Sequence, residues 1–523
     1  MKKTGKLMAL ALSAAAIFSV SACGDRGPRG DSADTLYIRI FDGGYGTAFV
    51  DAATEIFNEK YPDIKVEVEP TVYDEQFATN LLSGVTSTDL FFGRKAMFEY
   101  MYDSFRGQDG TIYECALADL SDVYESEVDG QKVKDKLLDE YVRANEFTRD
   151  DGTVKYYTFP WVRGMLGILK NNKVWKDSWE IPNTTNELLA LCEQIKRDSC
   201  TPFIYSLNDS YYYIFEPIFV AQYEGVERME QYWAGYNASG QRYNSDFLVL
   251  DGQLESLKVM EDLLKASNGY QHEASYSIDF TATQNMFLED SNNIAMMVNG
   301  DWIEREMRAN YSPEETDIEF IKTPVISALG TKLGIGDSTL SAIIDYVDGT
   351  VTEAPVFTSS EGLSSQEVIE KVRAARSLEM TNSDCHCCWI PAYSNMVDYA
   401  KEFLKILASD EGIRAFSRAT FGYSAPYQYN VLDDPEVAES SSDFINSTLR
   451  LMNRSTVYWP DYSDRIFALG KLTPHTNGQN GFETYFSATS DRDFLSAETY
   501  YTRSCTYAAS MWQNYRQRAG IAG

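Results

Sequence analysis

The beginning of the globular chain predicts a strand, a helix and a second strand in succession. Apolar and polar residues alternate from Leu36 to Phe41, and Phe49 and Phe57 then fall on one helical face before a second alternating run at 64–68. Parallel strands need a crossover, which is usually a helix, so this pattern predicts a βαβ unit. Helical faces and short apolar runs continue along the chain without a repeat of about 20–50 residues, which disfavours solenoids and propellers. The predicted class is α/β.

Length and charge narrow the possible functions. At about 150 residues per domain, 523 residues indicate at least two structural units. Acidic residues number 78 against 46 basic ones, and the formal charge of -32 would repel nucleic acids and anionic lipid surfaces. Aromatic residues make up 13% of the chain, which suits flat amphipathic surfaces for neutral polar ligands such as sugars.

The N-terminal residues predict export. Three lysines precede an uncharged segment from Leu7 to Val20, which Ser-Ala and then Cys23 follow. The segment is shorter than the roughly 18 residues that span a bilayer, so residues 1–22 are predicted to be a lipoprotein signal peptide. The triplet before Cys23 resembles the bacterial lipobox, which implies lipid attachment at Cys23. The residues after it have no hydrophobic period, so 23–34 are predicted to be the lipidated cysteine and a flexible tether. The alternative is an ordinary signal peptide and a structural cysteine.

A glycine-rich turn, Asp42-Gly43-Gly44-Tyr45-Gly46, follows the first predicted strand. Ligands of open α/β sheets bind at the carboxyl ends of the strands, so this turn is a candidate wall of a binding crevice. A plain connection is equally compatible with it. It is not a phosphate-binding loop, because neither glycine motif for phosphates occurs here.

One segment makes a family resemblance visible. Residues 294–302, IAMMVNGDW, resemble the A-M-x-x-x-G-x-W segment of extracellular solute-binding proteins of family 1, which serve ABC importers for sugars. Other segments resemble that family in its order: ATEIFNEKYP at 53–62, DLFF at 89–92, DGT to FPW at 151–161, LKNN at 169–172, NTTNEL at 183–188, and WIP at 389–391. Asn186 stands where the family usually has tryptophan.

The resemblance implies a two-lobed periplasmic-binding-protein-like fold (class II), with two α/β lobes, a hinge and an interlobe ligand cleft. We expect the chain to cross between lobes near 158, 319 and 412. Residues 35–158 and 320–412 would then form lobe 1, and residues 159–319 and 413–523 would form lobe 2.

Sugar chemistry selects the candidate ligand-binding residues. A pyranose offers C–H bonds on its faces and hydroxyl groups on its rim, so its site needs aromatic platforms and planar polar groups. The candidate platforms are Trp161, Trp233, Trp302 and Trp389; the candidate rim partners are Asp42, Asp89, Asn299 and Asp301; Tyr45 and Tyr212 suit either role. Core packing is the alternative for each tryptophan, and a helix cap is the alternative for Asp89.

The implied function is that of a substrate-binding lipoprotein of an ABC transporter. It would capture a mono- or oligosaccharide and deliver it unaltered to permease subunits with a separate ATPase. We expect a monomer without cofactor, metal or catalytic activity, held by lipid on Cys23 at the outer face of a bacterial cell membrane.

Three alternatives stay open. A secreted carbohydrate-active enzyme would also be aromatic and acidic, although the signatures H-E-x-x-H and G-x-S-x-G do not occur in the sequence. A surface glycan-binding lipoprotein could act without an importer. The cargo could also be a peptide or a polyamine.

The cysteine residues do not predict a metal site. Cys192 and Cys200 could close a small loop or remain free, and Asp384-Cys385-His386-Cys387-Cys388 resembles a metal-binding tract. Successive residues of a strand point to opposite faces, so this run cannot surround one tetrahedral ion. We expect strand thiols or a local disulfide there.

Overall fold

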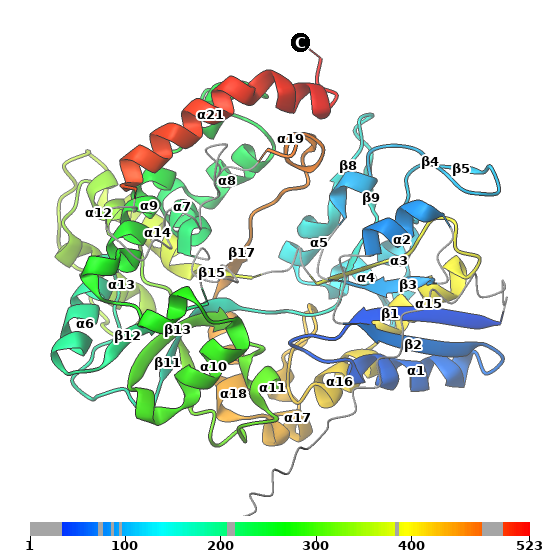
Figure 1. The fold of residues 1–523 in the computed structure, drawn as a ribbon, viewed down its shortest axis with the longest axis horizontal. Helices are drawn as coiled ribbons and strands as arrows, with labels where there is room; N and C mark the ends of the chain where they lie inside the picture. Colours follow the sequence, from blue (N-terminus) through cyan, green and yellow to red (C-terminus); the bar gives the residue numbers. More distant parts are fainter. Residues whose placement is uncertain are drawn as a thin grey trace, which may run out of the picture.

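The computed structural model describes residues 34–71, 77–84, 88–93, 97–206, 215–381, 386–472 and 495–522. Two lobes lie side by side, each built around its own β-sheet (Figure 1). The two-lobed α/β prediction is therefore confirmed. Within these residues, no helix combines the length and apolar character needed to cross a membrane. The predicted signal peptide, Cys23 and the tether up to residue 33 lie outside the described residues.

The first lobe contains the predicted βαβ unit. Strand β1 (Thr35–Phe41) pairs in parallel with β2 (Lys65–Thr71), and α1 (Ala48–Lys60) connects them. Helix α1 buries its apolar face, including Phe49 and Phe57, which confirms the helical periodicity. The five-stranded sheet has the order β10-β16-β3-β1-β2. Its remaining strands are β3 (Leu90–Phe92), β10 (Phe159–Pro160) and β16 (Cys387–Trp389).

Short elements complete this lobe. Three two-stranded hairpins project from it: β4 (Phe105–Arg106) with β5 (Ile112–Tyr113), β6 (Glu127–Val128) with β7 (Gln131–Lys132), and β8 (Glu146–Thr148) with β9 (Val154–Tyr156). Its other helices are α2 (Phe77–Ser83), α3 (Ser121–Glu125), α4 (Val133–Lys136), α5 (Asp139–Asn145), α15 (Val397–Leu407) and α16 (Asp410–Ala419).

The second lobe surrounds a six-stranded sheet. Strand β13 (Ile294–Gly300), buried along its whole length, lies between β12 (Thr201–Ile204) and β11 (Leu166–Asn171). Strand β14 (Ile318–Ile321) pairs with β11, and β15 (Leu378–Met380) joins β11 to β17 (Thr456–Tyr458). The 7 consecutive buried residues of β13 are typical of a strand covered on both faces.

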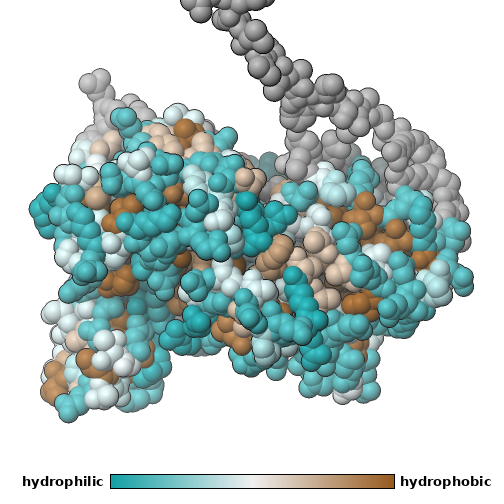
Figure 2. Space-filling model, turned by 90° about the horizontal axis from the view of Figure 1, so that it is seen from below, coloured by the Kyte–Doolittle hydropathy of each residue, from teal (hydrophilic) through white to brown (hydrophobic). Residues whose placement is uncertain are grey.

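Helices make up most of the rest of this lobe. They are α6 (Thr185–Arg197), α7 (Phe215–Glu224), α8 (Val226–Trp233), α9 (Asp251–Leu264), α10 (Phe280–Leu288), α11 (Ile303–Met307), α12 (Ala328–Lys332), α13 (Asp337–Asp348), α14 (Ser365–Ser377), α17 (Pro435–Ser440), α18 (Asp443–Met452), α19 (Arg465–Ala468) and α21 (Ala497–Arg518). The long helix α21 packs along α9 at the top of this lobe (Figure 1). On the face shown in Figure 2, hydrophilic residues predominate and apolar residues form separated patches.

The sheets locate the crossings between lobes. The first lies between β10 and β11, and the third follows α16, which packs on α1, and precedes α18, which packs on β14. The first lies next to the position expected near 158, whereas the third lies within 420–442, after the position expected near 412. The crossing expected near 319 is wrong, because β14 pairs with β11 and α12–α14 also pack in the second lobe. The second crossing lies between β15 and β16, so residues 320–380 belong to the second lobe.

Cys192 and Cys200 are both free thiols, so they do not close a loop. Cys387 and Cys388 lie on β16, where the Cys388 Sγ–H donates to the Phe159 carbonyl at 3.1 Å. These two residues are therefore strand thiols, one of the two arrangements expected. Cys385 lies outside the described residues.

Candidate ligand-binding site between the lobes

The three crossing segments lie next to one another at the junction of the lobes. Arg163 of the first crossing forms an antiparallel bridge with Ser424 of the third. The Trp161 backbone N–H donates to the His386 carbonyl at 3.3 Å, which joins the first crossing to the second. A bend in one segment therefore displaces its neighbours, which is the arrangement a hinge needs.

The glycine-rich turn after β1 brings the first lobe against the second. A Cβ atom at Gly44 would lie 2.4 Å from the Cβ of Trp302, which is far too close for two carbon atoms. Gly46 has a φ of 69°, a backbone conformation that glycine adopts at low cost. The glycines therefore permit a close backbone approach, here to Trp302 in the second lobe.

Tyr45 is the centre of an aromatic cluster between the lobes. Its hydroxyl donates to Asp301 Oδ1 at 2.7 Å, although 256 positions separate the two residues in the sequence. Four rings meet the Tyr45 ring edge to face: Trp161 at 6.0 Å, Trp302 at 6.0 Å, His386 at 5.1 Å and Tyr423 at 5.1 Å between centroids. Both lobes and all three crossing segments thus contribute to one site, which we call the junction cluster.

Trp161 has an unusual environment in this cluster. Its ring stacks on Phe49 of α1, with centroids 4.9 Å apart and planes 14° apart. Its side chain is buried, yet its Nε1–H has no hydrogen-bond partner among the residues that the structure describes. A buried donor without a partner is costly, and it identifies a place where an acceptor on a ligand would be stabilised.

Asp301 supplies the carboxylate of the cluster. It is 2% exposed, and burial raises its pKa from 3.8 to about 7, although the hydrogen bond from Tyr45 acts in the opposite direction. The Tyr423 hydroxyl fixes the same residue from the third crossing by donating to its backbone carbonyl at 3.0 Å. Near neutral pH this carboxyl group can therefore accept a hydrogen bond or, when protonated, donate one.

Four of the predicted residues, Tyr45, Trp161, Asp301 and Trp302, thus meet in the junction cluster. Asp42 is exposed in the same turn. Asn299 is buried at the end of β13, where its Oδ1 accepts the Gly300 backbone N–H at 2.7 Å.

The other predicted residues lie elsewhere. Asp89 immediately precedes β3, and its carboxylate accepts the Tyr37 backbone N–H at 2.9 Å and the Ser394 hydroxyl at 2.7 Å. Trp389 is completely buried in the first lobe and stacks on Phe91 at 4.1 Å. Asp89 and Trp389 therefore make structural contacts within one lobe.

Trp233 belongs to a different aromatic group in the second lobe. Its Nε1–H donates to the Tyr458 hydroxyl at 3.0 Å, and its ring packs against Tyr462. It lines a small cavity of about 20 Å³ that also contains the buried Glu216. Tyr212 lies outside the described residues.

Two members of the cluster, His386 and Tyr423, were not among the predicted site residues. His386 is part of the cysteine-rich tract, whose composition resembles that of a metal site rather than of a sugar site. Tyr423 follows Gly422 in a segment with no motif of the resemblance. Its only sequence signal was its position shortly after the crossing expected near 412.

Comparison with known proteins decides the family. The family model described as "Bacterial extracellular solute-binding protein" matches residues 43–338, which is more than half of the chain. The matched range includes Tyr45, Trp161, Asp301 and Trp302. The chain belongs to this solute-binding protein family.

The solute-binding protein has a relative in Streptomyces coelicolor (strain ATCC BAA-471 / A3(2) / M145), the diacetylchitobiose binding protein NgcE. The two are 25% identical over 203 residues, which is 36% of this chain and 40% of the relative. The GacH receptor of Streptomyces glaucescens GLA.O is a structural neighbour, with a TM-score of 0.54 and 14% identity over 94% of this chain and 99% of that one. This likeness supports the two-lobed fold.

Proposed function

We propose that this protein is the substrate-binding lipoprotein of an ABC importer, which captures a carbohydrate between its lobes and delivers it unaltered to a membrane permease. The observation that carries the proposal is the junction cluster, where tryptophan rings from a crossing segment and the second lobe meet Tyr45 and Asp301. Flat rings and planar polar groups are the chemistry that sugar faces and hydroxyl groups require. The unpartnered Trp161 Nε1–H would serve a sugar oxygen.

The related proteins support the choice of carbohydrate. NgcE is named for diacetylchitobiose binding, and GacH was solved in unliganded form and in complex with acarbose and an acarbose homologue. Both ligands are carbohydrates, and neither relative is described as an enzyme. We therefore propose binding without catalysis. Lipid on Cys23 would hold the monomeric receptor at the outer face of the membrane, and the permease would work with a separate ATPase.

Ligand entry requires the lobes to separate. In this structure the Tyr45 hydroxyl donates a hydrogen bond directly to the Asp301 carboxylate, and the surrounding rings are buried. A sugar would enter the opened junction, and its hydroxyl groups would replace the Tyr45–Asp301 hydrogen bond. Because the sugar contacts both lobes only when they close on it, binding favours the closed form, which a permease could recognise.

A thermal-shift screen with mono- and oligosaccharides tests the proposal. A ligand at 100 times its dissociation constant stabilises the folded state by about 2.7 kcal/mol. Peptides and polyamines serve as comparison ligands. Any saccharide that binds is then incubated with the protein and analysed by chromatography. We expect stabilisation by a saccharide that is recovered intact; turnover of the sugar, or stabilisation by a peptide or polyamine alone, contradicts the proposal.

A further inference from the structure

A second cavity lies in the first lobe, where its hairpins meet the second lobe. Its volume is about 250 Å³, and its lining residues are Tyr102, Glu114, Phe147, Arg149, Asp150 and Asp151. Hairpin β8–β9 and the residues flanking hairpin β4–β5 supply these side chains. None of them belongs to the junction cluster, and we call this space the hairpin cavity.

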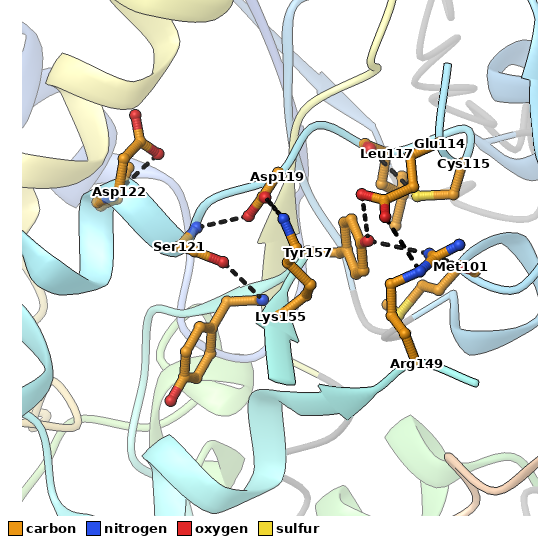
Figure 3. Close-up of polar contacts among 12 residues, drawn as sticks. Met101, Glu114, Cys115, Leu117, Asp119, Ser121, Asp122, Arg149, Lys155 and Tyr157 are labelled. Carbon is orange, nitrogen blue, oxygen red and sulfur yellow. Dashed lines mark hydrogen bonds and ion pairs between the residues drawn. The ribbon is translucent and has the colours of Figure 1, made fainter. Parts of the chain in front are cut away.

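Arg149 lines the hairpin cavity, and its polar contacts are drawn in Figure 3. Its Nε lies 3.1 Å from Glu114 Oε1, and its Nη1 donates to the Met101 carbonyl and the Tyr157 hydroxyl at 3.0 Å each. The Tyr157 hydroxyl in turn donates to Glu114 Oε2 at 3.0 Å. Nη2 makes no hydrogen bond to the residues that the structure describes, so a preoriented donor remains available.

The cavity combines an aromatic wall with a polar rim. Tyr102 and Phe147 meet edge to face with their centroids 4.8 Å apart. Phe147 is buried, whereas Asp150 and Asp151 are exposed at the turn of the β8–β9 hairpin. Apolar ring surface next to carboxylate acceptors and a guanidinium donor is the combination that a hydroxylated ring can satisfy.

The second lobe closes over the edge of this cavity. The Tyr102 hydroxyl donates to the Ser463 carbonyl at 2.6 Å, and the Arg465 guanidinium lies 5.1 Å from the centre of the Tyr102 ring. Arg465 also forms an ion pair with Asp150. The hairpin cavity therefore lies on the junction between the lobes.

Aromatic contacts continue along this junction from the hinge toward the hairpin cavity. Trp459 of the second lobe packs on Tyr141 of α5, with ring centroids 6.4 Å apart. The Tyr141 hydroxyl shares a hydrogen bond of 3.5 Å with Thr381 Oγ1, and Thr381 also contacts the first crossing through the Gly164 carbonyl. Trp459 lies four residues before Ser463, the residue that binds Tyr102.

We infer that the hairpin cavity is a distal subsite for one uncharged sugar residue of an oligosaccharide whose other end occupies the junction cluster. This inference rests on the proposed function. A volume of about 250 Å³ is below the roughly 300–1,000 Å³ of pockets that enclose a whole drug-sized ligand, so it fits one ring of a longer chain. Glu114 pairs with Arg149 and Arg465 pairs with Asp150, so the remaining negative charge, that of Asp151, would repel an acidic sugar.

Calorimetric titration with a length series of the best-binding oligosaccharide tests the subsite. The informative variant is Arg149→Met, which keeps an apolar stem and removes the donor. The matched control is Lys155→Met on the same hairpin, because Lys155 pairs with Asp119 outside the cavity (Figure 3). Circular dichroism establishes that both variants fold. Phe147→Leu serves as a second subsite variant, which changes the aromatic wall and keeps the charges of Arg149 and Glu114.

We expect wild-type affinity to rise at one chain length. Arg149→Met should remove about a tenfold part of that rise while leaving shorter ligands unaffected, as expected for one charge-assisted hydrogen bond. Phe147→Leu should act in the same direction, and Lys155→Met should behave as wild type. Equal loss at every length, no change at any length, or a rise only for amino sugars overturns the subsite. Failure of every saccharide to bind the wild-type protein overturns the proposed function as well.

Discussion

Replacement of Asp301 by asparagine should change how stability depends on pH. Burial raises the pKa of Asp301 from 3.8 to about 7. Between these values the folded protein binds more protons at this residue than the unfolded chain does, so stability falls as pH rises. The contribution of protonated Asp301 is fully present below about pH 4 and lost above about pH 7. The difference between the two pKa values corresponds to a contribution of about 4 kcal/mol to the free energy of unfolding.

The assay is urea unfolding of wild type and Asp301→Asn from pH 4.5 to pH 8, followed by tryptophan fluorescence. Asparagine keeps the shape of the side chain and can still accept the Tyr45 hydrogen bond. Other buried carboxyl groups with a pKa of about 7, those of Glu306 and Glu379, are present in both proteins and cancel in the difference. We expect the variant to gain stability relative to wild type by about 1.4 kcal/mol per pH unit up to about pH 7.

A companion variant checks the cause. The hydrogen bond from Tyr45 lowers the pKa of Asp301 and so opposes burial. Tyr45→Phe should therefore extend the pH-dependent loss of stability to higher pH. Parallel stability curves for wild type and Asp301→Asn across the whole range would refute the reasoning, because they would mean that Asp301 titrates alike in the folded and unfolded chains.

Two further substitutions test the junction. Gly44→Ala should weaken saccharide binding and enlarge the ligand-bound particle in small-angle scattering, because its Cβ would lie 2.4 Å from the Cβ of Trp302; Gly336→Ala, which meets open space, should change neither. Trp161→Ala should abolish saccharide binding in calorimetry and lower the free energy of unfolding by about 3–5 kcal/mol, because the ring is buried against Phe49. If Trp161→Ala still binds saccharide, Trp161 is not part of the ligand-binding site.

Local sequence patterns predicted individual helices and strands better than they predicted which strands pair in a sheet. The alternation over 36–41 and 64–68 and the helical face between them predicted β1, α1 and β2, because burial of one face depends only on nearby residues. The crossing expected near 319 was wrong because periodicity does not say which sheet a strand joins. Strand β14 returns beside β11, and this pairing is set by packing across more than a hundred residues.

The candidate site was predictable only in part. Trp302 follows a buried strand in a recognisable motif, and Tyr45 lies in a glycine turn at a strand end. The sequence could not distinguish these from Trp389, which fills the core of one lobe, since tryptophan serves both purposes. His386 and Tyr423 reach the cluster only through the crossing segments, so their roles depend on the tertiary arrangement.

A crystal structure with the tightest-binding oligosaccharide tests the central claim most directly. The account predicts a sugar ring between the lobes, in contact with Trp161 and Trp302, with a sugar oxygen bonded to Asp301 in place of the Tyr45 hydroxyl. A sugar bound on the surface of one lobe, with the Tyr45–Asp301 hydrogen bond intact, would contradict it.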